Sequence, residues 1–256
     1  MRNSLMITIM IFLVITTSAV LAQELTGNEV LQRVEENRSE KSHYIEMRME
    51  LYNKAGDMRS RSLNNYFLED NNLDRSLIEF TSPADIEGTK FLSLDEKNTT
   101  EEDMYLYLPV LTSVRKISGS QKNGNFVGSD LTYNDLNIFS GANYRDNFNG
   151  TIIEENEEEV KLRLEIIDPD IDYSFGYMVV LKEYWLPNKL EFYNQNEELE
   201  KVINLSEYEK IDNNWTARHI QVENIQKGSQ TILKMEEVDF NPDLDPNIFT
   251  VRYLQR

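Results

Sequence analysis

The sequence predicts a mainly β fold with some α-helix, built as an antiparallel meander. Segments of alternating apolar and polar residues recur along the chain, and Gly, Pro, Asn or Asp residues separate most of them. Few segments have the helical spacing that crossover helices between parallel strands would need. The chain has 256 residues, of which 40% are hydrophobic and 28% are charged, so one domain with a sizeable core is expected.

The first 22 residues have the order of a secretory signal peptide. Arg2 gives a positive start, residues 5–15 are apolar apart from one threonine, and Ala22 ends the segment before the polar residues begin. We expect cleavage after Ala22, which leaves residues 23–256 as a single domain in the periplasm. A membrane anchor is the alternative, but the hydroxyl side chains of residues 16–18 interrupt the apolar run.

Composition excludes some partners and some sources of stability. The formal net charge is −19, so the surface as a whole repels a phosphate backbone, and nucleic acid is not an expected partner. The chain has no cysteine, so neither a lipid anchor on a thiol nor a disulfide is available to it. Stability must therefore come from core burial and sheet pairing.

After the expected signal peptide, the sequence has first the pattern of a helix and then the pattern of a strand. Thr26 and Glu29 form a capping box, and the apolar spacing after them predicts a helix over about residues 28–40. The period then changes to two, which predicts a strand over residues 45–51 and a turn over residues 54–57.

Eight further segments are expected to be strands, and one short helix lies among them. The acidic run at residues 154–159 reads as a solvated turn between two strands. A short helix is expected within residues 131–139. The strand segments are residues 73–81, 104–108, 160–167, 177–185, 189–193, 199–208, 215–225 and 230–238.

Catalytic and metal-binding motifs are weak, so we expect no enzyme, no metal and no cofactor. The two histidines, His43 and His219, lie far apart and lack the spacing of metal ligands. The stretch at residues 118–120 is not a nucleophile elbow, and no phosphate-binding loop follows the glycines of this region. An extracellular hydrolase that uses carboxylates is the remaining enzymatic alternative.

Aromatic and methionine residues suggest a different role. The chain has 13 Tyr, 11 Phe and 9 Met, and each strand offers one apolar face. A sheet of such strands can bury that face against itself, against the first helix or against a ligand. Core filling is the simpler interpretation, whereas flexible Met47 and Met49 would suit a cavity that accepts variable shapes.

The stretch from Ser82 to Leu136 resembles the bacterial outer-membrane lipoprotein-sorting proteins of the LolA-like family. The order of signal peptide, helix, strands and signature is similar as well. The residues that carry the resemblance are Ser82-Pro83-Ala84-Asp85-Ile86-Glu87-Gly88-Thr89, Tyr105-Leu106-Tyr107-Leu108-Pro109, Val114-Arg115-Lys116-Ile117-Ser118-Gly119-Ser120-Gln121 and Phe126-Val127-Gly128-Ser129-Asp130-Leu131-Thr132-Tyr133-Asn134-Asp135-Leu136.

The resemblance implies a strongly curved, incompletely closed antiparallel β-barrel, with an N-terminal helix and a helical lid. Such proteins carry lipid or lipoprotein acyl chains through the periplasm, and related ones accompany transporters of the resistance-nodulation-division class. Arg115 and Lys116 are then candidates for contact with a lipid headgroup or a partner protein, and Gly119, Gly124 and Gly128 would shape the loop. The apolar cavity is expected to be lined by Ile45, Met47, Met49, Leu51, Leu106, Leu108, Leu162 and Leu164.

A carrier of this kind has a clear physical purpose. Moving a sixteen-carbon chain into water exposes about fourteen methylenes at roughly 0.8 kcal/mol each, or about 11 kcal/mol. A cavity removes most of that barrier, and an acceptor of higher affinity suffices for delivery. The alternative function is a binding or sensory module that engages a membrane transporter or an envelope-stress system without moving lipid.

Overall fold

The computed structural model describes residues 25–37, 40–70, 73–96, 102–140 and 144–256. The expected signal peptide and its cleavage site lie outside these residues. Within them, no helix combines the length and the apolar character that crossing a membrane requires.

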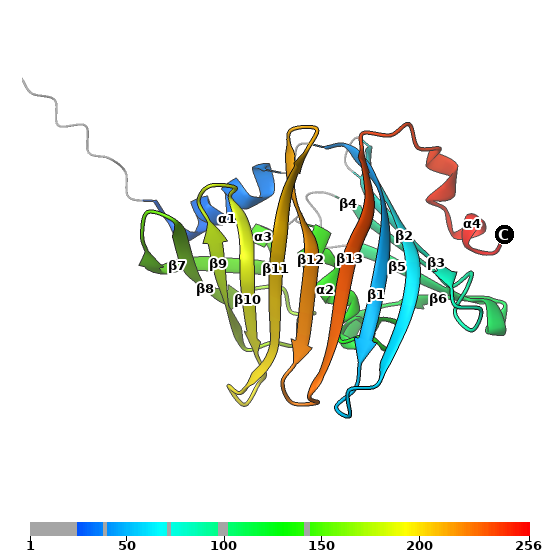
Figure 1. Cartoon of the computed structure of the whole chain (residues 1–256), viewed down its shortest axis with the longest axis horizontal. Coiled ribbons are helices and arrows are strands. Elements are labelled where there is room, and N and C mark those ends of the chain that lie inside the picture. The colour runs from blue at the N-terminus through cyan, green and yellow to red at the C-terminus, as the bar shows by residue number, and fades with distance from the viewer. Residues whose placement is uncertain (1–24, 38–39, 71–72, 97–101, 141–143) are drawn as a thin grey trace, which may run out of the picture.

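The described residues form one sheet of thirteen strands, ordered β6-β5-β4-β3-β2-β1-β13-β12-β11-β10-β9-β8-β7 (Figure 1). Every neighbouring pair is antiparallel. The strands are β1 (Ser42–Tyr52), β2 (Met58–Asp70), β3 (Leu73–Ser82), β4 (Lys90–Glu96), β5 (Glu102–Leu108), β6 (Ser113–Ile117), β7 (Phe148–Glu155), β8 (Glu159–Ile166), β9 (Phe175–Leu181), β10 (Leu186–Tyr193), β11 (Leu199–Ile211), β12 (Asn214–Asn224) and β13 (Ser229–Phe240).

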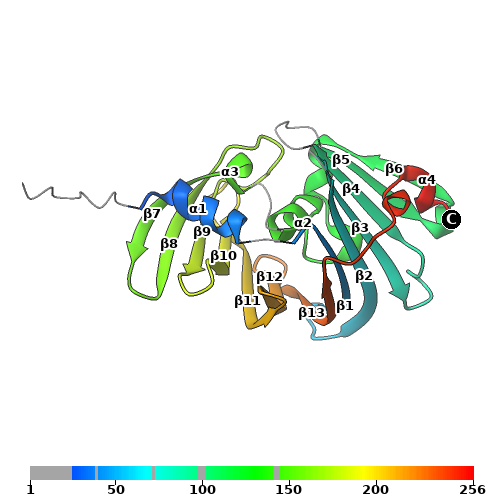
Figure 2. The same ribbon diagram turned by 90° about the horizontal axis from the view of Figure 1, so that it is seen from above.

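The order of the strands explains the shape of the molecule. The chain winds outward from β1 to the edge strand β6, crosses to the opposite edge at β7, and returns until β13 pairs with β1 in the middle. Seen from above, the sheet curves strongly, and β6 and β7 stand far apart at its two ends (Figure 2). The expected curved, incompletely closed antiparallel barrel is therefore confirmed.

Short helices lie against this sheet. The capping box at the first helix is confirmed, because the Glu29 N–H donates to Thr26 Oγ1 at 3.2 Å and the Thr26 N–H donates to Glu29 Oε2 at 2.7 Å. The helix ends at Glu36, earlier than the spacing predicted. The helices are α1 (Gly27–Glu36), α2 (Tyr133–Ser140), α3 (Tyr144–Asn147) and α4 (Val251–Leu254), with 3-10 turns η1 (Pro109–Leu111), η2 (Gly119–Asn123), η3 (Phe126–Gly128) and η4 (Pro246–Ile248).

We call the strands β7 to β11 the β7–β11 arm, and helix α1 lies on the concave face of its outer part, against β7. Gly27 and Gly150 touch through their backbones, because a Cβ atom added to Gly27 would lie 2.2 Å from the Gly150 oxygen. This close approach brings Val30 and Leu31 of the helix into the same core as Leu162. Glycine at both positions is thus what allows α1 to lie directly on the sheet.

Helix α2 and the turns that precede it after β6 lie inside the curve of the sheet (Figure 2). We call residues 118–140 the plug. Its Phe126 ring packs at 5.8 Å from Phe80 and 5.4 Å from Phe91, and its Leu131 is fully buried. The plug contains α2, the short helix that the sequence predicted within residues 131–139.

The C-terminal residues 241–256, which we call the strap, cover the convex face of β2 to β5 (Figures 1 and 2). Phe249 and Leu254 of the strap form a second core with Leu77 and Leu92, whose side chains point away from the concave face. The Lys90 Nζ donates to the Arg256 carbonyl at 3.1 Å and ties the end of the strap to β4. The strands β1 to β6, which we call the β1–β6 arm, thus have the plug on part of their concave face and the strap on part of their convex face.

Sequence alternation located nine of these strands. The expected segments coincide with β1, β3, β5 and β8 to β13, although β9 ends at Leu181 and the residues up to Trp185 form a turn. The strands β2, β4, β6 and β7 were not expected. The acidic run at residues 154–159 spans the connection between β7 and β8, but the exposed turn itself is only residues 156–158, because residues 154 and 155 end β7 and residue 159 begins β8.

Candidate functional site

A hollow of about 240 Å³ remains on the concave face between the two arms. Its walls are inward side chains of β1 to β4 and of β10 to β13. Val34 of α1 and Tyr144 of α3 also border the hollow, and Phe126, Leu131 and Leu136 of the plug border it as well. The hollow therefore lies where neither α1 nor the plug fills the curve of the sheet.

Alternation along β1 supplies the apolar floor of the hollow. Ile45, Met47 and Met49 all point to the concave face and line it. Met47 pairs across to Leu63 of β2, and Met49 pairs across to Leu233 of β13, so apolar side chains continue on both sides. Such a floor suits hydrocarbon, and the two methionines adapt to its shape.

One end of the hollow is polar. His43 lies at the start of β1, Asp74 at the start of β3, and Ser93 and Asp95 at the end of β4. Because β4 runs opposite to β1 and β3, these positions meet at the same end of the sheet. The hollow thus has a polar end and an apolar interior, which is the arrangement that an amphiphile requires.

Tyrosine side chains in the wall add no charge to the hollow. Burial raises the pKa of Tyr144 and of Tyr208 well above the ordinary value of 10.0. The Tyr208 hydroxyl donates to the Pro187 carbonyl at 2.6 Å, which satisfies it within the protein. Both side chains therefore stay neutral at any pH that the folded protein meets.

The other expected lining residues lie elsewhere. Leu162 and Leu164 are fully buried in the core beneath α1, so they belong to the solid part of the β7–β11 arm. Leu106 is buried in the same continuous core, and Leu51 and Leu108 are partly buried against it. The described lining of the hollow includes none of these five leucines.

The two cations of the signature lie on the edge strand β6, and both side chains are exposed. The Lys116 ammonium lies 2.6 Å from Asp103 Oδ1, and this hydrogen bond lowers the pKa of the Asp103 carboxyl. Neither Arg115 nor Lys116 reaches the hollow. A contact with a partner protein therefore fits their position better than a contact with a ligand in the hollow.

Two of the three signature glycines occupy backbone conformations that favour glycine. Gly119 has φ +53° and Gly128 has φ +77°, both in the left-handed region, at the start of η2 and the end of η3. Gly124 has φ −70° instead, and a Cβ atom there would lie 3.0 Å from the Gln121 oxygen. The tight turns of the plug therefore depend on Gly119 and Gly128.

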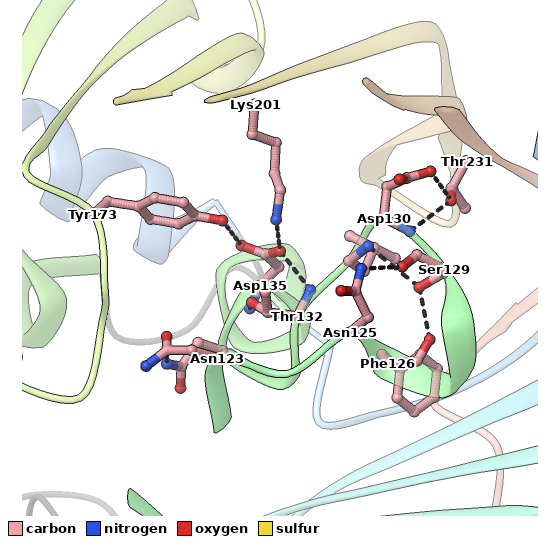
Figure 3. A network of polar contacts seen from close by, with 12 residues as sticks. Asn123, Asn125, Phe126, Ser129, Asp130, Thr132, Asp135, Tyr173, Lys201 and Thr231 are labelled. Carbon is pink, nitrogen blue, oxygen red and sulfur yellow. Dashed lines mark hydrogen bonds and ion pairs between the residues drawn. The ribbon is translucent and has the colours of Figure 1, made fainter. Parts of the chain in front are cut away.

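A buried polar network holds the plug against the concave face of the sheet (Figure 3). Lys201 of β11 forms an ion pair with Asp135 of α2, and both side chains are almost fully buried. The Tyr173 hydroxyl donates to Asp135 Oδ1 at 3.1 Å, and the Thr132 N–H donates to Asp135 Oδ2 at 2.6 Å. The carboxylate is thus satisfied on both oxygens, which a buried charge requires.

A second group of bonds holds the other side of the plug. The Thr231 hydroxyl of β13 donates to Asp130 Oδ2 at 2.9 Å, and the Ser229 hydroxyl donates to Asp130 Oδ1 at 2.5 Å. The Asp130 N–H donates back to Thr231 Oγ1 at 2.9 Å. The plug is therefore attached to β11 and to β13, at two separate places on the sheet.

Sequence reasoning assigned no role to these anchors. A signal was present, because Lys201 occupies the same alternating face as Ile203 and Leu205, where a lysine needs a buried partner. Its partner Asp135 lies in the signature but far away in sequence. No group of residues in the described ranges has the make-up of a metal site.

The fold and the hollow together define an open, curved half-barrel with an apolar hollow on its concave face. A crystal structure of a putative outer-membrane lipoprotein-sorting protein domain from Vibrio parahaemolyticus has 29% sequence identity and a TM-score of 0.81, over 90% of this chain and 98% of that chain. A DUF1329 family protein from Desulfovibrio piger has 27% identity and a TM-score of 0.82, over 88% of this chain and 96% of that chain.

More distant similarity extends to a LolA superfamily protein from Nitrosomonas europaea, with 20% identity and a TM-score of 0.68 over 90% of this chain and 99% of that chain. No curated protein matches the sequence significantly. A family model with the description "-like: Uncharacterized protein" matches residues 72–256. The chain belongs to that family, and its fold is similar to the folds of these three solved structures.

Proposed function

We propose that this protein is a periplasmic carrier that binds lipid or the acyl chains of lipoproteins in the hollow and delivers them towards the outer membrane. The observation that carries the proposal is the hollow itself, which has an apolar floor and a polar end. The likeness to a protein described as a putative lipoprotein-sorting domain supports it. No step of the proposed function needs a catalytic group or a nucleotide.

Loading and delivery require a partner, and we propose an inner-membrane transporter of the resistance-nodulation-division class. The tip between β5 and β6 carries Val110, which is 87% exposed, and Leu111, which is 45% exposed. Exposed apolar side chains beside the exposed Arg115 are typical of a protein–protein contact. Cross-linking in cells from a residue introduced at Val110 is expected to give an adduct with a membrane protein.

Native mass spectrometry of the protein without residues 1–22 tests the carrier directly. After gentle extraction we expect a bound lipid or acylated peptide, and harsh extraction should remove it. A fluorescent fatty-acid probe should then bind to the emptied protein. If no lipid is found and no probe binds, the proposal is wrong.

A matched pair of variants tests whether the fatty-acid probe binds in the hollow. Ala217 lines the hollow, so Ala217→Leu is expected to fill part of it and to weaken probe binding at least tenfold. Ala55 lies in the exposed turn between β1 and β2, so Ala55→Leu adds the same side chain far from the hollow and should leave binding unchanged. Equal affinities for both variants would show that the probe binds elsewhere.

A further inference from the structure

We infer that the hollow holds one hydrocarbon chain, so that the ligand is a single-chain amphiphile, or one chain of a larger lipid whose other chains stay outside. This inference rests on the proposed function and deepens it. It follows from the volume of the hollow, from what fills the rest of the curve, and from how the plug is held.

The volume limits the length of chain that fits. A dry apolar cavity of about 150 Å³ accepts one benzene molecule, which corresponds to about 25 Å³ for each carbon. On that scale the hollow of about 240 Å³ takes about ten carbons of a single chain. Three chains of sixteen carbons would need about 1,200 Å³ on the same scale, or about five times the space.

Among the described residues, packed side chains occupy the curve of the sheet on both sides of the hollow. In the β7–β11 arm, Phe148, Leu164 and Phe192 are fully buried in the same core as Leu31 of α1, so the part of the arm around these residues is solid. On the other side, Phe126 and Leu131 of the plug occupy the space in front of β3 and β4. A second chain would have to displace one of these two packed elements.

The anchors of the plug oppose such a displacement. Moving the plug outward would break the buried ion pair between Lys201 and Asp135, and it would also break the bonds between Asp130 and Thr231. Separating the two ions would leave charges without partners in a nonpolar environment, which is strongly unfavourable. The hollow therefore keeps its width when a chain enters.

The entering chain also has a defined direction. The polar end of the hollow, near His43 and Ser93, receives the headgroup, and the methyl end of the chain reaches towards Met49 and Leu131. In chains longer than about ten carbons, the methyl end stays inside, and the carbons nearest the headgroup extend out of the hollow past its polar end. Their number should then have little effect on affinity.

A chain-length series tests this inference on the full mature protein. The probes are fatty acids and lysophosphatidylcholines of six to sixteen carbons, used below their micelle concentrations, and affinity is measured by displacement of a fluorescent fatty acid. We expect each methylene to tighten binding about fourfold up to about ten carbons, with little change for longer chains. Native mass spectrometry should show one probe molecule for each protein.

Probes with more chains separate the inference from the proposed function. A diacyl phospholipid and a triacylated lipopeptide should bind no more tightly than the single-chain probe of the same chain length. If affinity rises through sixteen carbons, or if a second chain tightens binding at least tenfold, the single-chain inference is wrong and the carrier function stands. If no probe of any kind binds, the carrier function itself is wrong.

Two variants that each remove three non-hydrogen atoms from a side chain sharpen the test. Met49 lines the hollow, and Met49→Ala removes three non-hydrogen atoms. The plateau, which is the chain length at which affinity stops rising, should therefore move from about ten to about thirteen carbons. Leu162→Ala removes three carbons from the solid β7–β11 arm, and its plateau should stay where it is in the unmodified protein. A plateau at the same length in Met49→Ala would contradict the placement of the chain.

Discussion

The two arms of the sheet are covered differently, and this difference decides where the hollow lies. In the β7–β11 arm, α1 lies on the outer part of the concave face, and no element in the described part of the chain covers the convex face. The β1–β6 arm has the plug on its concave face and the strap on its convex face. The hollow lies between the two arms, over the strands around the β1–β13 pair, which we call the seam. Neither α1 nor the plug covers the concave face of the seam completely.

Aromatic side chains show the same contrast on the convex face. On the bare arm, Phe175 and Tyr193 stack at 4.5 Å, and the Arg163 guanidinium lies 4.8 Å from the Phe175 ring centre. These side chains shield one another, which stands in for a covering element. On the other arm, Tyr66 and Tyr105 instead pack against the strap.

The largest expected effect comes from the anchor that joins the plug to β11. Lys201→Met leaves the Asp135 carboxylate buried without its cation, and we expect the free energy of unfolding to fall by about 3–5 kcal/mol. Urea denaturation followed by tryptophan fluorescence measures this loss. Because both arms contact the plug, the whole domain should unfold in one transition.

A double variant shows whether charge or packing is responsible. Lys201→Met combined with Asp135→Leu removes both charges, and most of the lost stability should return. If the double variant is as unstable as the sum of the single variants, the pair contributes through packing alone. The argument that the plug is held by electrostatics would then be wrong.

Sequence alternation is clear in some strands and hidden in others, for a physical reason. Strand β8 alternates cleanly because one face packs under α1 and the other faces water. Strand β4 has Phe91 on the concave face and Leu92 under the strap, so apolar residues follow one another and the period of two disappears. Strand β2 was hidden differently, because the polar Asn65 occupies an inward position at the hollow.

The site was predictable only in part, because alternation tells which face is inside but not what covers it. Met47 and Leu162 have the same pattern around them, yet Met47 lines the hollow and Leu162 is sealed beneath α1. The difference arises from the contact between Gly27 and Gly150, which are more than a hundred residues apart in the chain. No local pattern contains that information.

The same substitution in each arm should give effects of different size. Leu31 of α1 is fully buried at the centre of the β7–β11 core, and Leu31→Ala is expected to cost about 3 kcal/mol of stability. Leu254 is equally buried, but α4 lies near the chain end and can shift to close the space, so Leu254→Ala should cost about 2 kcal/mol. Thermal unfolding of both variants checks the order, and a larger loss in Leu254→Ala would reverse our view of which covering element matters more.

The smallest expected effect lies at the seam of the two arms, and it is a contribution to stability that is lost in acid. The Lys234 ammonium of β13 donates to Glu50 Oε1 of β1 at 2.8 Å, and the Tyr52 hydroxyl donates to Glu50 Oε2 at 3.0 Å. The hydrogen bond from Lys234 is the main cause that holds the pKa of Glu50 below its ordinary value of 4.5. Because the folded pKa lies below the unfolded one, this contribution to stability is present above pH 4.5 and is lost as the pH falls through the folded value.

Glu50→Gln should therefore flatten the loss of stability between about pH 5 and pH 3, and at pH 7 it should cost less than about 1 kcal/mol, since Lys234 is partly exposed. Urea midpoints measured across this pH range provide the test. In a Lys234→Gln background most of the bonding to Glu50 is gone, so adding Glu50→Gln should change the acid slope much less. An unchanged slope for Glu50→Gln in the unmodified protein would mean that the seam is held by β1–β13 backbone pairing and apolar packing alone.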